Sequence, residues 1–154
     1  ASWHAARIMV PQGSGIIAMT SSFGATCYMH GPAYGAQKAG LDKLAHDMAH
    51  DFAGTGVAAV SLWLGPQITE RSKIAVQTNP EQYAGFLEMA ENPEFSAHVI
   101  AAIDQAANRD DLSGQTLIVA EIAKELGVTD RGNERPSHRA MLGSPRPKNP
   151  AAVY

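Results

Sequence analysis

Tyr34 and Lys38 are the two residues of this sequence whose types and spacing best suit proton transfer. They stand four positions apart in a segment of good helix formers that begins at Pro32, and an α-helix places such residues on one face. The positive charge of the lysine would favour the phenolate form of the tyrosine. The pair could then donate and accept a proton near neutral pH. A lysine that merely extends past a core tyrosine towards solvent would show the same spacing.

Hydroxyl groups stand where they could meet this pair. Residues 16–20 form an unbroken apolar run that predicts a strand buried on both faces, and Ser21 and Ser22 follow it. In open α/β sheets, ligands bind at the carboxyl ends of the strands, so a serine there could hydrogen-bond a substrate oxygen. Two serines can also simply end a strand. The functional interpretation gains weight because the helix with Tyr34 and Lys38 is expected to begin at the same edge.

The elements that must position these groups alternate between strand and helix. After the tail of a helix near the N-terminus, we expect strands at 16–20, 57–63 and 116–120, and helices at 32–52, 80–91 and 93–108. This order makes a right-handed βαβ unit in a parallel sheet, so the fold class is α/β. Residues 1–127 are expected to form the α/β part that carries the candidate catalytic groups. Residues 128–154 are rich in proline, glycine and arginine, and we expect them to form an irregular extension.

Composition and charge exclude several classes of function. The chain has 154 residues, of which 45% are hydrophobic, and its 12 basic and 15 acidic residues give a net charge of -3. That balance gives no broad attraction to nucleic acid or membranes, and no apolar run approaches the roughly 20 residues of a membrane span. The single Cys27 excludes an internal disulfide and suits a reducing compartment. We therefore expect a cytoplasmic protein that acts on a small molecule.

A metal site is not expected. His46 and His50 have the spacing of a helical metal pair, but they project away from Tyr34, and Lys43 lies on their side of the helix. A solvated or oligomer-facing helix surface explains them better.

Three stretches of the sequence resemble the short-chain dehydrogenase/reductases, and among them the branch around family member 1. Residues 15–24, GIIAMTSSFG, resemble the strand that ends in the active-site serine of that family. Residues 32–40, PAYGAQKAG, resemble its Tyr-x-x-x-Lys helix start, and residues 60–70, VSLWLGPQITE, resemble the strand and Pro-Gly loop that close over the nicotinamide. The likeness continues through residues 113–115 and 125–130.

The resemblance implies hydride transfer between NAD(P)H and a carbonyl or alcohol carbon. By this analogy Tyr34 is the general acid and base, Lys38 favours its ionised form and binds the nicotinamide ribose, and a serine orients the substrate oxygen. Thr69 would contact the nicotinamide carboxamide. Tyr34, Lys38, Gly65, Gln67 and Thr69 are the cofactor-binding residues that the resemblance implies. The cofactor that the resemblance implies is NAD or NADP, with a slight preference for NADP.

The register of the serine stays open. The usual spacing back from Tyr34 favours Ser21, whereas alignment of the strand and its serine pair favours Ser22, which we prefer. The sequence also departs from the family pattern. Leu64 stands where the family has proline, and Gln67 stands where it has an aliphatic residue, so the loop expected to close over the nicotinamide differs from the family pattern at two positions.

The resemblance covers the C-terminal part of such an enzyme only. It implies a Rossmann-like, doubly wound parallel sheet, of which about three strands with flanking helices are present, and no strand with a glycine-rich phosphate-binding turn comes before them. Alone, the chain is expected to bind dinucleotide weakly or not at all, and to be inactive. The family also implies a homodimer or homotetramer.

Two other functions compete with the enzyme. The chain could be a non-catalytic remnant of the family or an interaction module. It could, with less support, be an α/β serine hydrolase, because Ser22-Phe23-Gly24 matches half of a nucleophile elbow. Thr20 occupies the position where that elbow needs its first glycine.

Overall fold

A three-stranded parallel sheet lies at the centre of the protein. The computed structural model describes residues 1–149, 151 and 153. The strands β1 (Gly15–Ser21), β2 (Val57–Trp63) and β3 (Thr116–Ile118) lie in the order β1-β2-β3. Ser21 lies opposite Trp63, and Trp63 lies opposite Ile118, so the carboxyl ends of all the strands meet at one edge. The expected α/β class and its parallel strands are confirmed.

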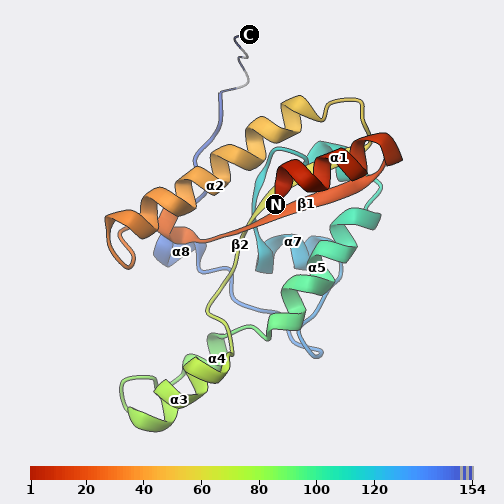
Figure 1. The fold of residues 1–154 in the computed structure, drawn as a ribbon. Helices are drawn as coiled ribbons and strands as arrows, with labels where there is room; N and C mark the ends of the chain where they lie inside the picture. The colour runs from red at the N-terminus through yellow and green to blue at the C-terminus, as the bar shows by residue number, and fades with distance from the viewer. Residues whose placement is uncertain (150, 152, 154) are drawn as a thin grey trace.

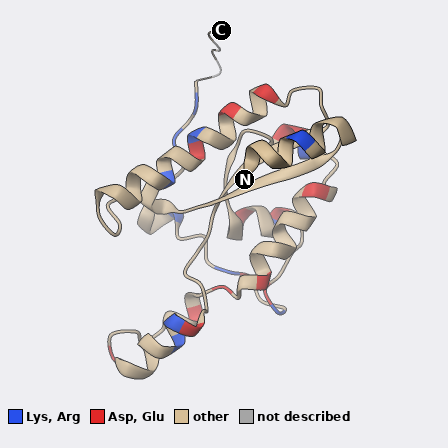
Figure 2. Ribbon diagram, viewed as in Figure 1, with Lys and Arg blue, Asp and Glu red and all other residues tan. Residues whose placement is uncertain are grey.

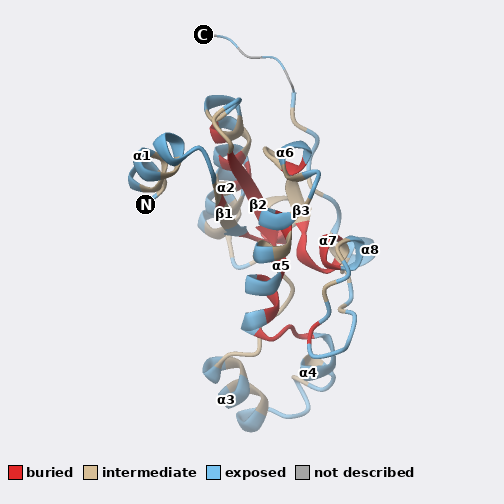
Figure 3. Ribbon diagram, turned by 90° about the vertical axis from the view of Figure 1, so that its right-hand side faces the viewer, coloured by how far each residue is buried: buried red, intermediate tan, exposed pale blue. Residues whose placement is uncertain are grey.

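Helices cover both faces of this sheet, as Figures 1 and 3 show. One face packs against α1 (Ser2–Gln12) and α2 (Pro32–Asp51), and the other packs against α5 (Pro93–Gln105) and α7 (Val119–Glu125). The short elements are η1 (Phe23–Ala25), α3 (Glu70–Thr78), α4 (Phe86–Met89), α6 (Arg109–Leu112) and α8 (Arg139–Leu142). None of the helices in the described residues has both the length and the apolar character needed to cross a membrane.

The composition of the central strand β2 explains why helices must cover both faces of the sheet. All of its residues are buried. Val60 and Leu62 pack into the cluster that includes α5 and α7, while Ala59 packs on the opposite side with α2. The three strands carry no charged side chains, and Figure 2 shows the charges on helices and loops instead. A strand buried on both faces is read from the sequence as a continuous apolar run, which is what residues 57–63 provide.

Three of the expected elements differ in the structure. The helix expected at 93–108 ends at Gln105, because Ala106 is extended. The helix expected at 80–91 is reduced to α4, because Gly85 adopts a left-handed conformation with φ of 74° and Ala90 is extended. The strand expected at 116–120 ends at Ile118, and Val119 begins α7. A short apolar run does not distinguish a buried strand from a buried helix, and Val119 is fully buried in the helical form. The helix α3 was not expected.

A buried carboxylate on α2 ties this helix to the central strand. Asp42 is 5% exposed, and it accepts hydrogen bonds from Ser61 Oγ at 2.6 Å and from Trp63 Nε1 at 3.0 Å. Because α2 carries Tyr34 and Lys38 at its beginning, these bonds help to fix their place relative to the strand ends. Nothing in the sequence analysis singled out this residue.

We expect Asp42→Ala to lower the free energy of unfolding by about 3 kcal/mol, because it leaves two buried donors without an acceptor. Urea unfolding followed by circular dichroism measures the change. Asp47→Ala on the same helix is the matched control, since Asp47 pairs with Lys43 at the surface, and its effect should stay below about 1 kcal/mol. Equal effects of the two substitutions would contradict a structural role for Asp42.

Candidate active site

A cavity of about 470 Å³ opens where β1 and β2 end and α2 begins. Its polar side is formed by Ser22, Tyr34 and Lys38, and the loop at 64–67 forms one wall. The remaining lining residues are Thr20, Ser21, Phe23, Met29, His30, Met89, His138, Met141 and Leu142. Residues expected from the sequence to share one edge of the sheet therefore line one cavity.

Ser22 and Tyr34 contact each other directly. Ser22 Oγ and Tyr34 Oη lie 2.9 Å apart, and the backbone N–H of Gly24 donates to Ser22 Oγ at 3.2 Å. A Cβ atom on Gly24 would lie 2.5 Å from Cε1 of Tyr34, so only glycine allows the ring to approach this turn. The hydroxyl of Ser22 thus has a fixed position beside the phenol. It bonds a tyrosine where a serine hydrolase would need a histidine, so the geometry does not favour the hydrolase.

Ser21 has a different environment. Its hydroxyl donates to the backbone carbonyl of Lys38 at 3.1 Å, and its side chain is buried. This bond joins the end of β1 to the first turns of α2. Of the two serines, Ser22 is the one that contacts Tyr34.

The ammonium group of Lys38 lies over the ring of Tyr34. Its Nζ is 5.4 Å from the ring centroid of Tyr34 and donates to the carbonyl of Thr20 at 3.0 Å. The ring of His30 packs edge-on against Tyr34 at 5.1 Å between centroids. His30 also has a positive φ of 54°, and the sequence analysis gave it no role. Tyr34 therefore has an ammonium group on one side and an imidazole beside its ring.

The loop that follows β2 contributes Leu64, Gly65, Pro66 and Gln67 to the cavity wall. Gln67 Nε2 donates to the carbonyl of Gly65 at 3.1 Å, so the side chain folds back over its own loop. Thr69 is not among the residues that line the cavity. It caps α3, where its Oγ1 accepts from the backbone N–H of Ser72 at 3.2 Å.

The segment after residue 127 also reaches the cavity. Most of it lacks regular secondary structure, but α8 and the preceding His138 bring His138, Met141 and Leu142 to the wall. Glu121 on α7 anchors this segment, since it accepts from Ser137 Oγ at 2.5 Å and from Arg139 Nε at 2.7 Å. The sequence gave no signal for this contribution, because irregular segments are placed by contacts between residues far apart in the chain.

Electrostatic effects at this anchor are consistent with its geometry. Hydrogen bonds from Arg139 lower the pKa of Glu121, with a further contribution from Ser137, although partial burial opposes them. Burial lowers the pKa of His138, whose ring packs edge-on against Phe23. The imidazole beside the cavity is therefore held in its neutral form over a wider pH range than an exposed histidine.

A second hollow, of about 580 Å³, lies elsewhere and is more open. It is formed by the later turns of α2, the turn at 113–116 and residues 145–148. His46 and His50 line it, with their rings 5.1 Å apart. It contains neither Tyr34 nor Ser22. Within the described ranges, no group of three or more histidine, cysteine, aspartate or glutamate side chains is placed to hold a metal ion.

The sequence is similar to proteins of one known family. Residues 1–80 match the family model described as short chain dehydrogenase. The human protein dehydrogenase/reductase SDR family member 1 is 38% identical over 136 residues, and the mouse protein of that name is 38% identical over 137 residues. Each alignment covers 84% of this chain and 44% of the relative. The chain thus spans less than half the length of these curated relatives.

Solved structures show the same fold. An oxidoreductase of the short chain dehydrogenase/reductase family from Burkholderia thailandensis has a TM-score of 0.60 and 24% identity, over 77% of this chain and 52% of that chain. A gluconate 5-dehydrogenase from Burkholderia cenocepacia, solved with NADP and tartrate, has a TM-score of 0.62 and 22% identity, over 76% of this chain and 48% of that chain. The expected Rossmann-like architecture and the expected resemblance are both confirmed.

Proposed function

Because the chain belongs to the short chain dehydrogenase family, we propose that the native protein is an NAD(P)-dependent oxidoreductase. It transfers a hydride between the nicotinamide and a carbonyl or alcohol carbon of a small molecule. One observation carries this proposal: Ser22 and Tyr34 share a hydrogen bond of 2.9 Å in a cavity that Lys38 also lines. Relatives with 38% identity named as dehydrogenase/reductases support it.

The residues around the cavity fit the nicotinamide end of such a cofactor. Lys38 would hold the ribose of the cofactor, because its ammonium group can donate to hydroxyl oxygens, and Gly65 offers a wall without a side chain. In the described part of the chain, Gly13 and Gly15 join α1 to β1, so they precede a strand and do not form the turn that binds a pyrophosphate. The described residues that would hold the cofactor therefore lie around its nicotinamide end. When bound, the dinucleotide supplies the hydride for reduction or accepts it for oxidation.

The chain's own residues transfer the proton and stabilise the charges that develop during the reaction. In reduction, Tyr34 Oη donates its proton to the carbonyl oxygen as that oxygen gains negative charge. Ser22 Oγ donates a hydrogen bond to the same oxygen and so sets its orientation. The ammonium of Lys38 stabilises the phenolate that remains on Tyr34. In oxidation, the phenolate accepts the hydroxyl proton of the alcohol, and the same groups act in reverse.

Several apolar side chains line the cavity beside its polar groups and favour a substrate with an apolar body. Met29, Met89 and Met141 come from three separate segments, and Leu64 and Leu142 lie beside them. Methionine side chains adapt to ligands of varied shape. The proposed substrate is therefore a carbonyl compound or alcohol whose polar group faces Tyr34.

Isotope transfer tests the proposed reaction. The native protein is incubated with NADPH or NADH that carries deuterium at both hydrogen positions of the hydride-donating carbon, together with a panel of apolar ketones and aldehydes. We expect deuterium to appear on the carbinol carbon of the product, measured by mass spectrometry. Folded protein that gives no nicotinamide-dependent product across the panel, or product without deuterium, would contradict the proposal and favour a non-catalytic member of the family.

A further inference from the structure

Glu91 is a buried carboxyl group behind the loop at 64–67, and it has no part in the proposed proton transfer. Its side chain is 1% exposed, although it lies in a short connection between α4 and α5. Burial of a carboxyl group is unfavourable unless hydrogen bonds compensate for the lost water. The hydrogen-bond partners of Glu91 therefore indicate which part of the structure this residue holds in place.

Those groups belong to the wall of the cavity. Gln67 Nε2 donates to Glu91 Oε2 at 2.6 Å, in addition to its bond with the carbonyl of Gly65. The main chains are also joined: Glu91 N–H donates to the carbonyl of Pro66 at 2.7 Å, and Ile68 N–H donates to the carbonyl of Glu91 at 2.9 Å. The carboxyl group packs directly against the loop, since a Cβ on Gly65 would lie 2.7 Å from Glu91 Oε1.

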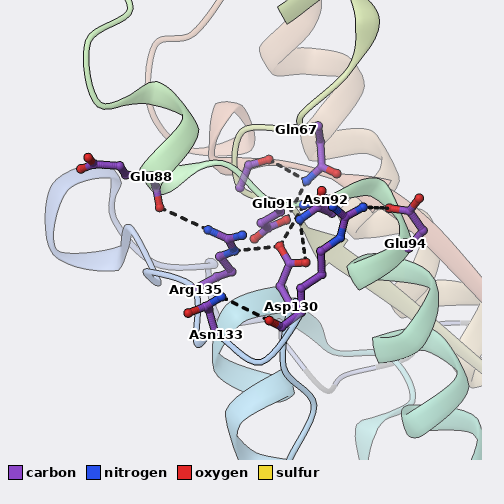
Figure 4. Close-up of polar contacts among 10 residues, drawn as sticks. Gln67, Glu88, Glu91, Asn92, Glu94, Asp130, Asn133 and Arg135 are labelled. Carbon is purple, nitrogen blue, oxygen red and sulfur yellow. Dashed lines mark hydrogen bonds and ion pairs between the residues drawn. The ribbon is translucent and has the colours of Figure 1, made fainter. Parts of the chain in front are cut away.

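The other side of this connection is fixed to the C-terminal segment (Figure 4). Asn92 donates to Asp130 through its backbone N–H and its Nδ2, each at 2.9 Å. Arg135 Nε donates to Asp130 at 2.7 Å, and Arg135 also reaches the carbonyl of Glu88 at 3.2 Å. Burial opposes ionisation of Asp130, but the bonds from Asn92 and Arg135 keep its pKa below the ordinary value. Glu91 thus lies between the cavity loop and an anchored segment.

We propose that Glu91 is a positioning residue, which acts through Gln67 to hold the loop at 64–67 against the cavity before any dinucleotide binds. Gly65, Pro66 and Gln67 line the cavity, whereas Glu91 does not, so its effect on a bound molecule is indirect. The inference rests on the proposed function only for the identity of that molecule. It also gives a role to Gln67, one of the two loop residues that depart from the family pattern.

The position of the loop should depend on pH. Burial raises the pKa of Glu91, against hydrogen bonds from Gln67 and the backbone of Gly65, while Asp130 raises it further and Arg135 lowers it. If the loop opens, Glu91 becomes hydrated and its pKa returns towards the ordinary value. A carboxyl group with a higher pKa in the closed state favours that state when protonated. Opening should therefore increase as the pH rises through the raised pKa.

Hydrogen exchange of the peptide at 64–69 tests the proposal without any cofactor. In Glu91→Ala we expect exchange about tenfold faster than in wild type, because the loop loses its buried partner. Glu91→Gln should restore protection, since its amide oxygen still accepts from Gln67. Glu88→Ala is the matched control, because Glu88 is an exposed carboxylate in the same segment, and it should change nothing.

Two results would overturn the proposal. One is an exchange rate at 64–69 that Glu91→Ala leaves within about twofold of wild type. If Glu91→Ala instead speeds exchange in β2 to the same extent, the variant has lost its overall fold. The proposal is then tested by the exchange rates of Glu91→Gln. The ratio of the wild-type rate to the Glu91→Gln rate cancels the intrinsic pH dependence of exchange. It should rise with pH, and a flat ratio overturns the proposal.

Kinetics of the native enzyme supply a separate readout. Glu91→Ala should raise KM for NADPH or NADH about tenfold and change kcat much less. The reason is that the loop at 64–67 contributes to cofactor binding, whereas Tyr34 and its neighbours carry out the proton transfer. Failure of the proposed function would show as absence of turnover in wild type, and the exchange result would still stand. Normal turnover with unchanged exchange would overturn the role of Glu91 alone.

Discussion

Replacement of Tyr34 by phenylalanine is expected to lower kcat by about a thousandfold, the usual loss when a positioned proton donor is removed. The phenyl ring keeps its contacts with Gly24 and His30, and Ser22 Oγ keeps its bond from the backbone of Gly24. The fold and dinucleotide affinity should therefore be unchanged. Steady-state kinetics of the native protein, with nicotinamide absorbance as the readout, measure kcat.

Tyr28→Phe is the matched control for this substitution. Tyr28 is 89% exposed and does not line the cavity, so loss of its hydroxyl should leave kcat unchanged. If Tyr34→Phe keeps more than about a tenth of the wild-type kcat, Tyr34 is not the proton donor. A large loss in both variants would indicate a general effect of the substitution on the protein.

Substitution of the two adjacent serines should separate their roles. Ser22→Ala is expected to lower kcat about a hundredfold, because the substrate oxygen loses a hydrogen bond that strengthens as charge develops. Ser21→Ala should leave kcat within a few-fold, since its hydroxyl donates to the carbonyl of Lys38. Loss of that bond should instead lower the free energy of unfolding by about 1 kcal/mol.

Kinetics and urea unfolding on both variants decide between the serines. A hundredfold loss of kcat in Ser21→Ala, with stability unchanged, would transfer the role to Ser21 and favour the spacing argument over the strand alignment. Equal losses in both variants would mean that the position of α2 relative to β1, and not one hydroxyl, limits the rate. The expected result is a loss confined to Ser22→Ala.

The elements that carry the site were predictable because local signals mark them. Pro32 begins α2 and the glycines at 54 and 56 follow its end, which is the usual asymmetry of helix boundaries. The continuous apolar run at 57–63 predicts a fully buried strand, and β2 has those bounds. Parallel pairing of the strands then brings Ser22 near Tyr34 by topology alone.

Other parts of the site depend on contacts that no local pattern encodes. The choice between Ser21 and Ser22 changes with one residue of register, and a shift of one residue in a strand turns every side chain to the other face. Glu91 and His138 come from irregular segments, which are placed by distant partners such as Gln67 and Glu121. The predicted strand extended past the end of β3 because Val119 is apolar, and an apolar residue fits a buried strand as well as the buried helix turn in which it lies.

The fluorescence of Trp63 should report on binding in the cavity. This residue is fully buried at the end of β2, its ring lies 5.0 Å from that of Phe23, and the next residue, Leu64, lines the cavity. An indole shielded from water emits at shorter wavelengths than an exposed one such as Trp3. This emission overlaps the absorption of reduced nicotinamide. Energy transfer from Trp63, with every other tryptophan of the native protein replaced by phenylalanine, would therefore signal binding of a reduced dinucleotide even when no substrate turns over.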